Sequence, residues 1–234
     1  MDHRAFIASL DPAQKETLHI RSNAKGLRHL AGHIGILVLM AAYIAGQLPY
    51  WGLLLLPYGI VMVFLFTLAH ECTHATPFAN PRLNDLVGHL VSLPLLLPFT
   101  WFRYFHLAHH KWTNDPERDP EIAHHGRPQT WRSYLIYLSG WGYWAGNGAV
   151  IWGNAFGRVE APYLPWRKHE AMHREAHIML VGYGLIALSF LFGDAALWLW
   201  IVPAMLGQPF LQLYLLAEHG LCPPVADMFE NTRT

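Results

Sequence analysis

Two long runs of uncharged residues near the start of the chain restrict the environments in which it can fold. Leu30–Leu48 and Trp51–Ala69 contain no Asp, Glu, Lys or Arg, and each is about 19 residues long. A helix rises about 1.5 Å per residue, so each run is roughly long enough to cross the hydrocarbon core of a bilayer. The short segment Gln47–Tyr50 joins them. We therefore predict a membrane protein with a helical hairpin in its first third.

A second pair of apolar runs lies near the end of the chain. Ile178–Phe192 and Ala195–Leu216 are separated only by Gly193 and Asp194. The first run of this pair is short and needs its flanking residues to span a bilayer. We predict two hairpins, with spans at about 30–48, 51–69, 177–193 and 195–216.

The segment between the hairpins contains apolar runs that do not resemble ordinary spans. Leu86–Thr100 has about 15 residues and includes Pro94 and Pro98, which favours a re-entrant or interfacial segment. Tyr134–Ala155 is longer, but five glycines and three tryptophans interrupt it. We interpret it as a helix that lies in the membrane plane or is partly inserted.

The distribution of charge favours this four-span arrangement. All 16 Lys and Arg residues then fall on one side: five precede Leu30, ten lie between Arg82 and Arg174, and Arg233 follows the last span. Cytoplasmic loops near spans carry such an excess of basic residues. The fold prediction is an all-α integral membrane protein, one domain over residues 1–234, with four transmembrane helices and a cytoplasmic histidine-rich helical cap.

Composition agrees with a membrane setting. The chain is 53% hydrophobic and only 14% charged, which is apolar for a soluble protein. Basic and acidic residues number 16 each, so the net charge is zero and gives no reason to expect nucleic acid as a partner. The 16 histidines are the unusual feature.

Two histidine motifs lie on the predicted cytoplasmic side. In the segment His70–His74, with the sequence HECTH, the two imidazoles are four residues apart, so a helix places them on one face. His106, His109 and His110 also share roughly one face if their segment is helical. Five neutral imidazoles without a cysteine ligand suit Fe, Zn, Cu or Ni rather than Mg or Ca.

The first motif has an alternative interpretation from another enzyme class. H-E-x-x-H supplies two ligands and a general base in zinc proteases, so an intramembrane zinc protease is possible. That function needs one more ligand and leaves His106, His109 and His110 unexplained. It also lacks an acidic partner in a later span, because Asp194 lies on the opposite side.

The two motifs together resemble a known family. H-x-x-x-H after the second span is followed about thirty residues later by H-x-x-H-H and then by T-N-D-P-E-R-D-P-E. This pattern is similar to the membrane fatty acid desaturases and related hydroxylases, over about residues 30–234. The resemblance implies that the histidines of both motifs hold a di-iron centre: His70, His74, His106, His109 and His110. His219 matches a histidine that the family places at the cytoplasmic end of the last span.

The resemblance also implies an activity. Two non-haem iron ions would activate dioxygen, and two hydrogens would leave a lipid or fatty acyl chain to give a double bond. Insertion of oxygen would instead make the protein a hydroxylase or ketolase, and both remain alternatives. Electrons would come from a separate donor such as a ferredoxin or a cytochrome.

Other polar residues near the motifs have two interpretations each. Four carboxylates could orient ligand rings from behind or belong to a solvated loop: Asp115, Glu117, Asp119 and Glu121. Three histidines at helical spacing could reach the metals or be polar tips of an interfacial helix: His169, His173 and His177. The remaining histidines are predicted to be surface or satisfied polar residues: His3, His19, His29, His33, His89, His124 and His125.

The resemblance also raises a question about the last part of the chain. The family closes its site with a third histidine motif after the last span, and no histidine follows His219 here. We expect this chain to be an N-terminal portion of a longer protein or a degenerate copy. On that expectation the 234-residue chain alone binds iron incompletely and has no desaturase activity.

A reporter fused after Asn154 tests the topology. We expect the fusion point on the cytoplasmic side, because a span at 134–155 would move four of the basic residues to the outer face. A fluorescent protein and alkaline phosphatase, each fused at this point, provide complementary readouts. Phosphatase activity without fluorescence would contradict the four-span arrangement.

Overall fold

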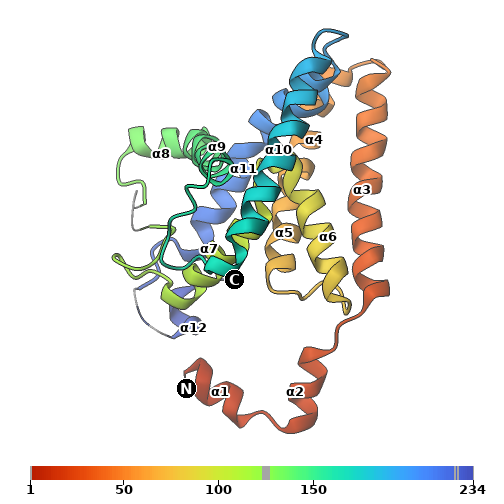
Figure 1. Ribbon diagram of the computed structural model, residues 1–234. Coiled ribbons are helices and arrows are strands. Elements are labelled where there is room, and N and C mark those ends of the chain that lie inside the picture. Colours follow the sequence, from red (N-terminus) through yellow and green to blue (C-terminus); the bar gives the residue numbers. More distant parts are fainter. Residues whose placement is uncertain (1, 123–126, 224, 226, 234) are drawn as a thin grey trace.

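The computed structural model describes residues 2–122, 127–223, 225 and 227–233. His124 and His125, predicted above to be surface residues, lie outside the described residues. The described part of the chain is helical and contains no strand, so the all-α prediction is confirmed. In Figure 1 the long helices run roughly side by side, and α8 (Trp131–Leu138) and α9 (Trp141–Ala155) project from one side of them.

The chain starts with two short helices, α1 (His3–Ser9) and α2 (Pro12–His19), and continues into the long helix α3 (Asn23–Ala45). Ser22 caps α3, because its side chain accepts a hydrogen bond from the Lys25 backbone N–H. Most of the first predicted span is therefore helical, and this helix stands at the edge of the molecule in Figure 1.

Three helical stretches of the described chain are long and apolar enough to cross a membrane: Pro12–Ala45, Trp51–Thr73 and Leu197–His219. They contain most of the predicted spans at 30–48, 51–69 and 195–216. A fourth candidate is the pair Pro81–Leu95 and Phe99–Trp112, whose two parts are bent by 97°. Such a pair fits either a broken span or a re-entrant loop, and the sequence predicts a re-entrant or interfacial segment there.

The predicted span at 177–193 is not among these candidates. α10 (His169–Ser189) ends before the predicted span does, and its first third carries charged residues and histidines. Only the part from Ile178 onward is apolar, which is short for a hydrocarbon core. The described chain thus has three or four candidate spans, but not at all of the four predicted places.

A close contact joins α4 (Leu55–Val63) and α11 (Val202–His219). α4 follows the short helix η1 (Trp51–Leu54), and α11 follows the π-helical turn η4 (Leu197–Ile201). A Cβ atom at Gly59 would lie 2.0 Å from the Pro203 carbonyl oxygen, and one at Gly207 would lie 2.3 Å from the Gly59 oxygen. Glycine at both positions therefore allows the two backbones to touch.

A sharp bend places α7 (Phe99–Trp112) beside α5 (Leu65–Thr73). The bend follows α6 (Pro81–Ser92) and the short helix η2 (Leu93–Leu95). Leu96 has a positive φ of 51°, and Pro98 occupies the position before the first residue of α7. The Phe99 ring then packs on α6 at Gly88, where a Cβ atom would lie 2.2 Å from it. The packing of Phe99 of α7 against Gly88 of α6 therefore holds the bend.

Residues 134–155 form two helices rather than the single helix predicted, because the chain breaks at Gly140 between α8 and α9. Gly140 has a φ of 71°, a conformation that favours glycine. A Cβ atom there would lie 2.2 Å from Gln208 Cγ on α11. The break thus brings the turn between α8 and α9 against α11, which α8 also contacts, while α9 packs along α10.

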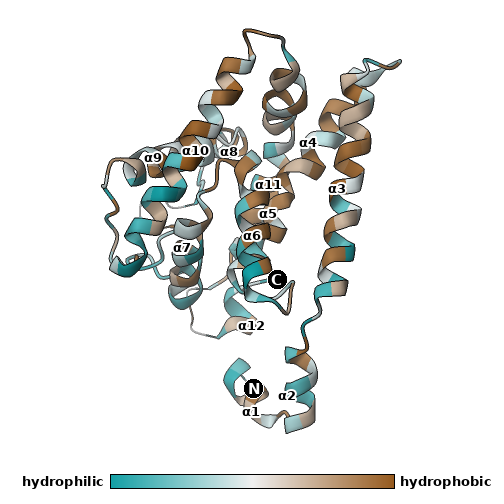
Figure 2. Cartoon of the chain, turned by 45° about the vertical axis from the view of Figure 1, so that its right-hand side comes forward, coloured by the Kyte–Doolittle hydropathy of each residue, from teal (hydrophilic) through white to brown (hydrophobic). Residues whose placement is uncertain are grey.

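The histidine motifs lie toward the polar end of the molecule. In Figure 2 the hydrophilic colour gathers around α7, α12 (Met228–Asn231), α1 and α2, and the hydrophobic colour is prominent on α3 and α4. In Figure 1 the turns that follow α3 and α10 lie at the opposite end. The ends of α5 and α7 that carry the histidines are therefore remote from these turns.

Replacing Gly59 or Gly207 by alanine is expected to destabilise the fold by about 1–3 kcal/mol, because the added methyl group overlaps backbone atoms of the facing helix. The measurement is unfolding in mixed micelles, followed by helical circular dichroism. Gly184→Ala in α10 is the matched control, since nothing lies within 4 Å of its Cβ position, and alanine's helix propensity should leave it neutral or more stable. Equal stability of all three variants would contradict the backbone contact.

Candidate metal centre

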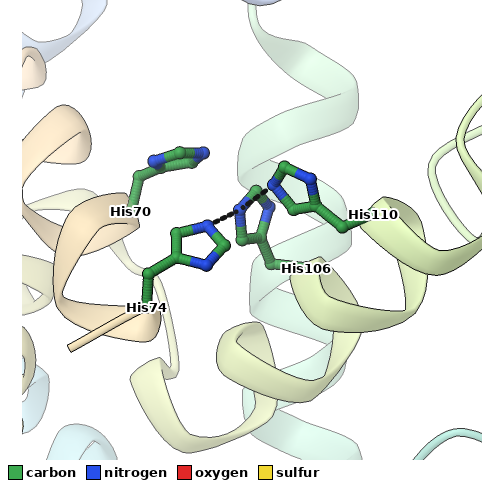
Figure 3. Close-up of side chains that lie close together, drawn as sticks. All are labelled: His70, His74, His106 and His110. Carbon is green, nitrogen blue, oxygen red and sulfur yellow. Dashed lines mark hydrogen bonds between the residues drawn. The ribbon is translucent and has the colours of Figure 1, made fainter. Parts of the chain in front are cut away.

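Four histidines from α5 and α7 converge on one point. His70 lies in the last turn of α5 and His74 follows at its end, while His106 and His110 lie one turn apart on α7. Each pair has the four-residue spacing that places two rings on one helix face. One ligand atom from each of the four rings lies within 4.8 Å of the others, and Figure 3 shows the rings facing one another.

The distances between the rings are those of groups that share a small centre. His106 Nε2 lies 2.8 Å from His74 Nε2 and 2.9 Å from His110 Nε2. His70 Nδ1 lies 3.0 Å from Glu71 Oε1, which fixes the orientation of that ring. Four imidazole nitrogens of this kind are a donor set that suits iron, zinc, copper or nickel. The residues present therefore fit a transition-metal ion.

A second histidine pair lies next to this cluster. His109 Nε2 is 3.0 Å from His219 Nε2, and both side chains are buried. The His109 ring centroid lies 5.7 Å from that of His110 and 6.1 Å from that of His106. The structure thus brings together all six predicted ligands, but as a cluster of four and an adjacent pair. The His109 ring does not point into the cluster, because consecutive helical residues such as His109 and His110 point about 100° apart.

The outer nitrogens of the second pair are held by groups behind them. His109 Nδ1 lies 2.8 Å from Asp119 Oδ1, and the Asp119 side chain is 0% exposed. Glu121 Oε2 lies 3.2 Å from the same nitrogen. His219 Nδ1 lies 3.1 Å from the Asn231 carbonyl oxygen. Contacts of this kind fix the tautomer and orientation of a metal-binding ring and direct its other nitrogen inward.

The four predicted carboxylates therefore differ in role. Asp119 and Glu121 contact His109, as the ring-orienting interpretation predicts. Asp115 instead accepts hydrogen bonds from Arg118 and from the Glu117 backbone N–H, and the Arg118 guanidinium holds the pKa of the Asp115 carboxyl below its usual range. Glu117 is exposed, in agreement with the loop interpretation.

Sequence reasoning missed two asparagines beside the second pair. Asn114 Nδ2 donates to the Asn231 carbonyl oxygen at 3.0 Å, and the Asn114 amide oxygen accepts from Arg127. The Asn114 backbone N–H also donates to Asp119. The contact between Asn114 and Asn231 joins segments more than a hundred residues apart, so no local pattern could have indicated it. This contact connects the loop behind His109 with the segment behind His219.

The third histidine stripe lies elsewhere. His173 Nδ1 is 2.9 Å from the Asn154 carbonyl oxygen on α9, and His177 Nδ1 is 2.9 Å from the His173 carbonyl oxygen. Neither belongs to the four-histidine cluster, and the stripe follows α10 where it faces α9. His89 also lies apart, because its Nδ1 is 2.8 Å from Glu175 Oε1, in agreement with its prediction as a satisfied polar residue.

The cluster opens into a cavity of about 830 Å³. All six histidines line it, and aromatic side chains form much of its remaining wall: Phe66, Trp101, Phe102, Phe105, Tyr137 and Trp141. Burial raises the pKa of the Tyr137 phenol, which therefore stays neutral. The cavity is large enough for a small lipid chain or a comparable ligand.

The arrangement does not resemble a zinc-protease site. Such a site pairs the two histidines of H-E-x-x-H with one further ligand and frees the glutamate to act as a base. Here Glu71 contacts His70 and accepts from the Thr76 hydroxyl at 2.6 Å. The other donors that close on His70 and His74 are His106 and His110.

Comparison with known proteins also indicates a lipid desaturase rather than a zinc protease. The sequence pattern of the family described as "Fatty acid desaturase" matches residues 45–234. The chain is 27% identical over 211 residues to an sn-1 oleoyl-lipid 12-desaturase of Anabaena variabilis, an alignment that covers 79% of this chain and 57% of that protein. It is 24% identical over 227 residues to the protein of the same description from Picosynechococcus sp., covering 92% of this chain and 63% of that protein.

A shorter and closer match is an sn-1 acyl-lipid omega-3 desaturase (ferredoxin) of Nostoc sp. It is 35% identical over 86 residues, which cover 37% of this chain and 24% of that protein. The chain spans roughly half to three fifths of the length of the first curated relatives that it matches.

Replacing Asp119 by asparagine is expected to lower metal affinity about 10- to 100-fold, because His109 loses the carboxylate that orients its ring. Asp115→Asn in the same loop is the matched control, since Asp115 contacts no histidine among the described residues and should retain normal affinity. Titration with Co²⁺, followed by its visible absorption, measures both variants. Equal affinities would show that Asp119 does not support a ligand.

Proposed function

Since the chain belongs to the fatty acid desaturase family, we propose that it forms the di-iron centre of a lipid desaturase that introduces a double bond into a fatty acyl chain. The proposed iron ligands are His70, His74, His106, His109, His110 and His219. The observation that carries the proposal is the convergence of imidazoles from α5 and α7 on the wall of a largely aromatic cavity. Dioxygen is the proposed co-substrate.

The chain's own residues would hold the metals and the substrate. Bound iron would supply the activation of dioxygen that removing hydrogen from an unreactive methylene requires. The four-histidine cluster suits one ion, and the adjacent His109–His219 pair, supported by Asp119 and the Asn231 carbonyl, offers two donors for a second. A shared centre of this kind accounts for both groups of rings.

The aromatic cavity wall would position the alkyl chain. Phe66, Phe102 and Phe105 lie beside the histidines in the wall, and Phe66 and Phe102 pack with their ring centroids 5.5 Å apart. A hydrocarbon chain gains from contact with such surfaces because its apolar surface leaves water. The same surfaces keep water from the reacting methylene, and close positioning of the reacting atoms lowers the barrier.

The remaining parts of the proposal concern the side of the membrane and the electron donor. We place the metal centre on the cytoplasmic side of the membrane, since the basic residues favour that side for the central segment. We propose a ferredoxin or a cytochrome as the electron donor. The name of the Nostoc relative includes ferredoxin, which supports the first of these.

The metal part of the proposal is tested by elemental analysis of the purified protein. Iron is expected in preference to zinc, and His106→Ala should cause the largest loss of iron, because its Nε2 lies within 2.9 Å of two other rings. His89→Ala is the matched control, since His89 contacts Glu175 outside the cluster, and it should retain wild-type iron. One tightly bound zinc per chain without iron would contradict the proposal.

The activity part is tested by lipid analysis of a host that expresses the complete protein. A new double bond in the acyl lipids, absent with His106→Ala and present with His89→Ala, is the expected result. A new hydroxyl or keto group without a double bond would overturn desaturation and support the related oxygen-inserting function. The pair of variants separates loss of the centre from loss of expression.

A further inference from the structure

The cavity has a polar region away from the histidines. Tyr143 and Asn147 line it from α9, where their four-residue spacing places both side chains on one helix face. Gln212 lines it from α11, and Gln208 lies one turn earlier on that helix. The turn between α8 and α9 closes against this point, because Gly140 packs on the Gln208 side chain.

Several polar atoms in this region are buried and unpaired. Asn147 is 8% exposed and Gln208 is 0% exposed. Within the described chain, neither the Asn147 amide nitrogen nor either amide atom of Gln208 has a hydrogen-bond partner. The Tyr143 hydroxyl interacts with the Asn147 side chain but makes no hydrogen bond of ordinary geometry. A buried polar group without a partner costs about 1–3 kcal/mol. Tyr143 and Asn147 lie on the cavity wall, and Gln208 lies one helical turn from Gln212, which also lines it. Unpaired groups on a cavity wall indicate that a ligand supplies the missing partners.

The position of this region follows from α11. Gln208, Gln212, Leu215 and His219 are spaced i, i+4, i+7 and i+11, so all lie on one face of that helix. At about 1.5 Å per residue, Gln212 and Gln208 lie roughly 10 and 16 Å from His219 along the axis. A chain that reaches both regions would extend from the metal centre to the polar region.

The chemistry of the region selects the kind of ligand. Its side chains are amides and a phenol, and all are neutral. The charged residues of the cavity wall lie instead near the histidines or in the loop segments beside them: Glu71, Glu121, Arg127 and Glu218. Neutral donors such as an amide N–H suit an uncharged oxygen atom, while a carboxylate or phosphate would need a cation to offset its desolvation.

We propose that Tyr143, Asn147 and Gln212, with Gln208 behind them, form a binding site for an uncharged oxygen group on the substrate chain. The substrate is then an alkyl chain with an ester carbonyl or a hydroxyl at a distance from the oxidised carbons. This inference rests on the proposed function, because it takes the cavity to be the site of the lipid substrate.

The test compares ligands of equal chain length. Hexadecane, hexadecan-1-ol, methyl hexadecanoate and hexadecanoic acid compete for a pyrene-labelled alkane bound to the purified full chain in micelles. The alcohol or the ester should compete roughly ten-fold better than the alkane, in line with one or two hydrogen bonds to buried groups. The arm that competes better identifies the oxygen group, and the carboxylate should gain no such preference.

Variants then locate the preference. Tyr143→Phe and Asn147→Leu should each remove most of it while hexadecane binds as before. Asn154→Leu is the matched control, because Asn154 is also buried on α9 with an unpaired amide nitrogen but does not line the cavity. Tyr143→Phe keeps the ring, so it decides the question if Asn147→Leu does not fold.

Two results would overturn the proposal. Equal binding of hexadecane, the alcohol and the ester to the unaltered chain would mean that the polar side chains of the proposed site bind water or no ligand at all. An equal loss of preference in Asn154→Leu would mean that the effect is not local. The measurement needs neither iron nor turnover, so its failure is distinct from a failure of the metal centre or of desaturation.

Discussion

The bend between η2 and α7 is the constraint on which the four-histidine cluster depends. His70 and His74 pair through helical spacing alone, as do His106 and His110, but the pairs meet only because the chain turns through 97° before α7. Without that turn, α7 would continue away from α5. The positive φ of Leu96 and the proline at position 98 allow the turn, and the packing of Phe99 against Gly88 holds it.

The features that the sequence predicted correctly depend on residues close together in the chain, and the features that it missed depend on residues far apart. Four-residue spacing predicted which rings share a helix face, and charge-free runs predicted the apolar helices, because both signals are local. The span at 177–193 stays a prediction, since the polar start of α10 leaves a short apolar part there. Gly140 was recognised as an interruption of an apolar run, but its contact with Gln208 depends on how α9 meets α11, which no local pattern contains.

The same reasoning explains the predicted ligands. Spacing alone placed His109 with His106 and His110, whereas its actual partners are Asp119, ten residues later, and His219, 110 residues later. The resemblance to the desaturases indicated His219, because a family pattern records a long-range contact that a helical period cannot. Asn114 and Asn231 were missed because one acts through its side chain on the backbone of the other. Backbone acceptors carry no signature in the sequence.

The cavity would connect the proposed metal centre with a second requirement on the proposed substrate. Its aromatic wall can accept any alkyl chain, so hydrophobic contact alone would let a chain slide and expose several methylenes to the histidines. A fixed hydrogen bond at the α9 and α11 side would remove that freedom, because α11 is helical throughout from Gln212 to His219. The carbon that meets the metals would then be set by its distance from the oxygen group. On this view, moving the glutamine side chain to a position one helical turn away on α11 would shift the oxidised carbon by roughly 5 Å along the alkyl chain. The histidines would not need to change.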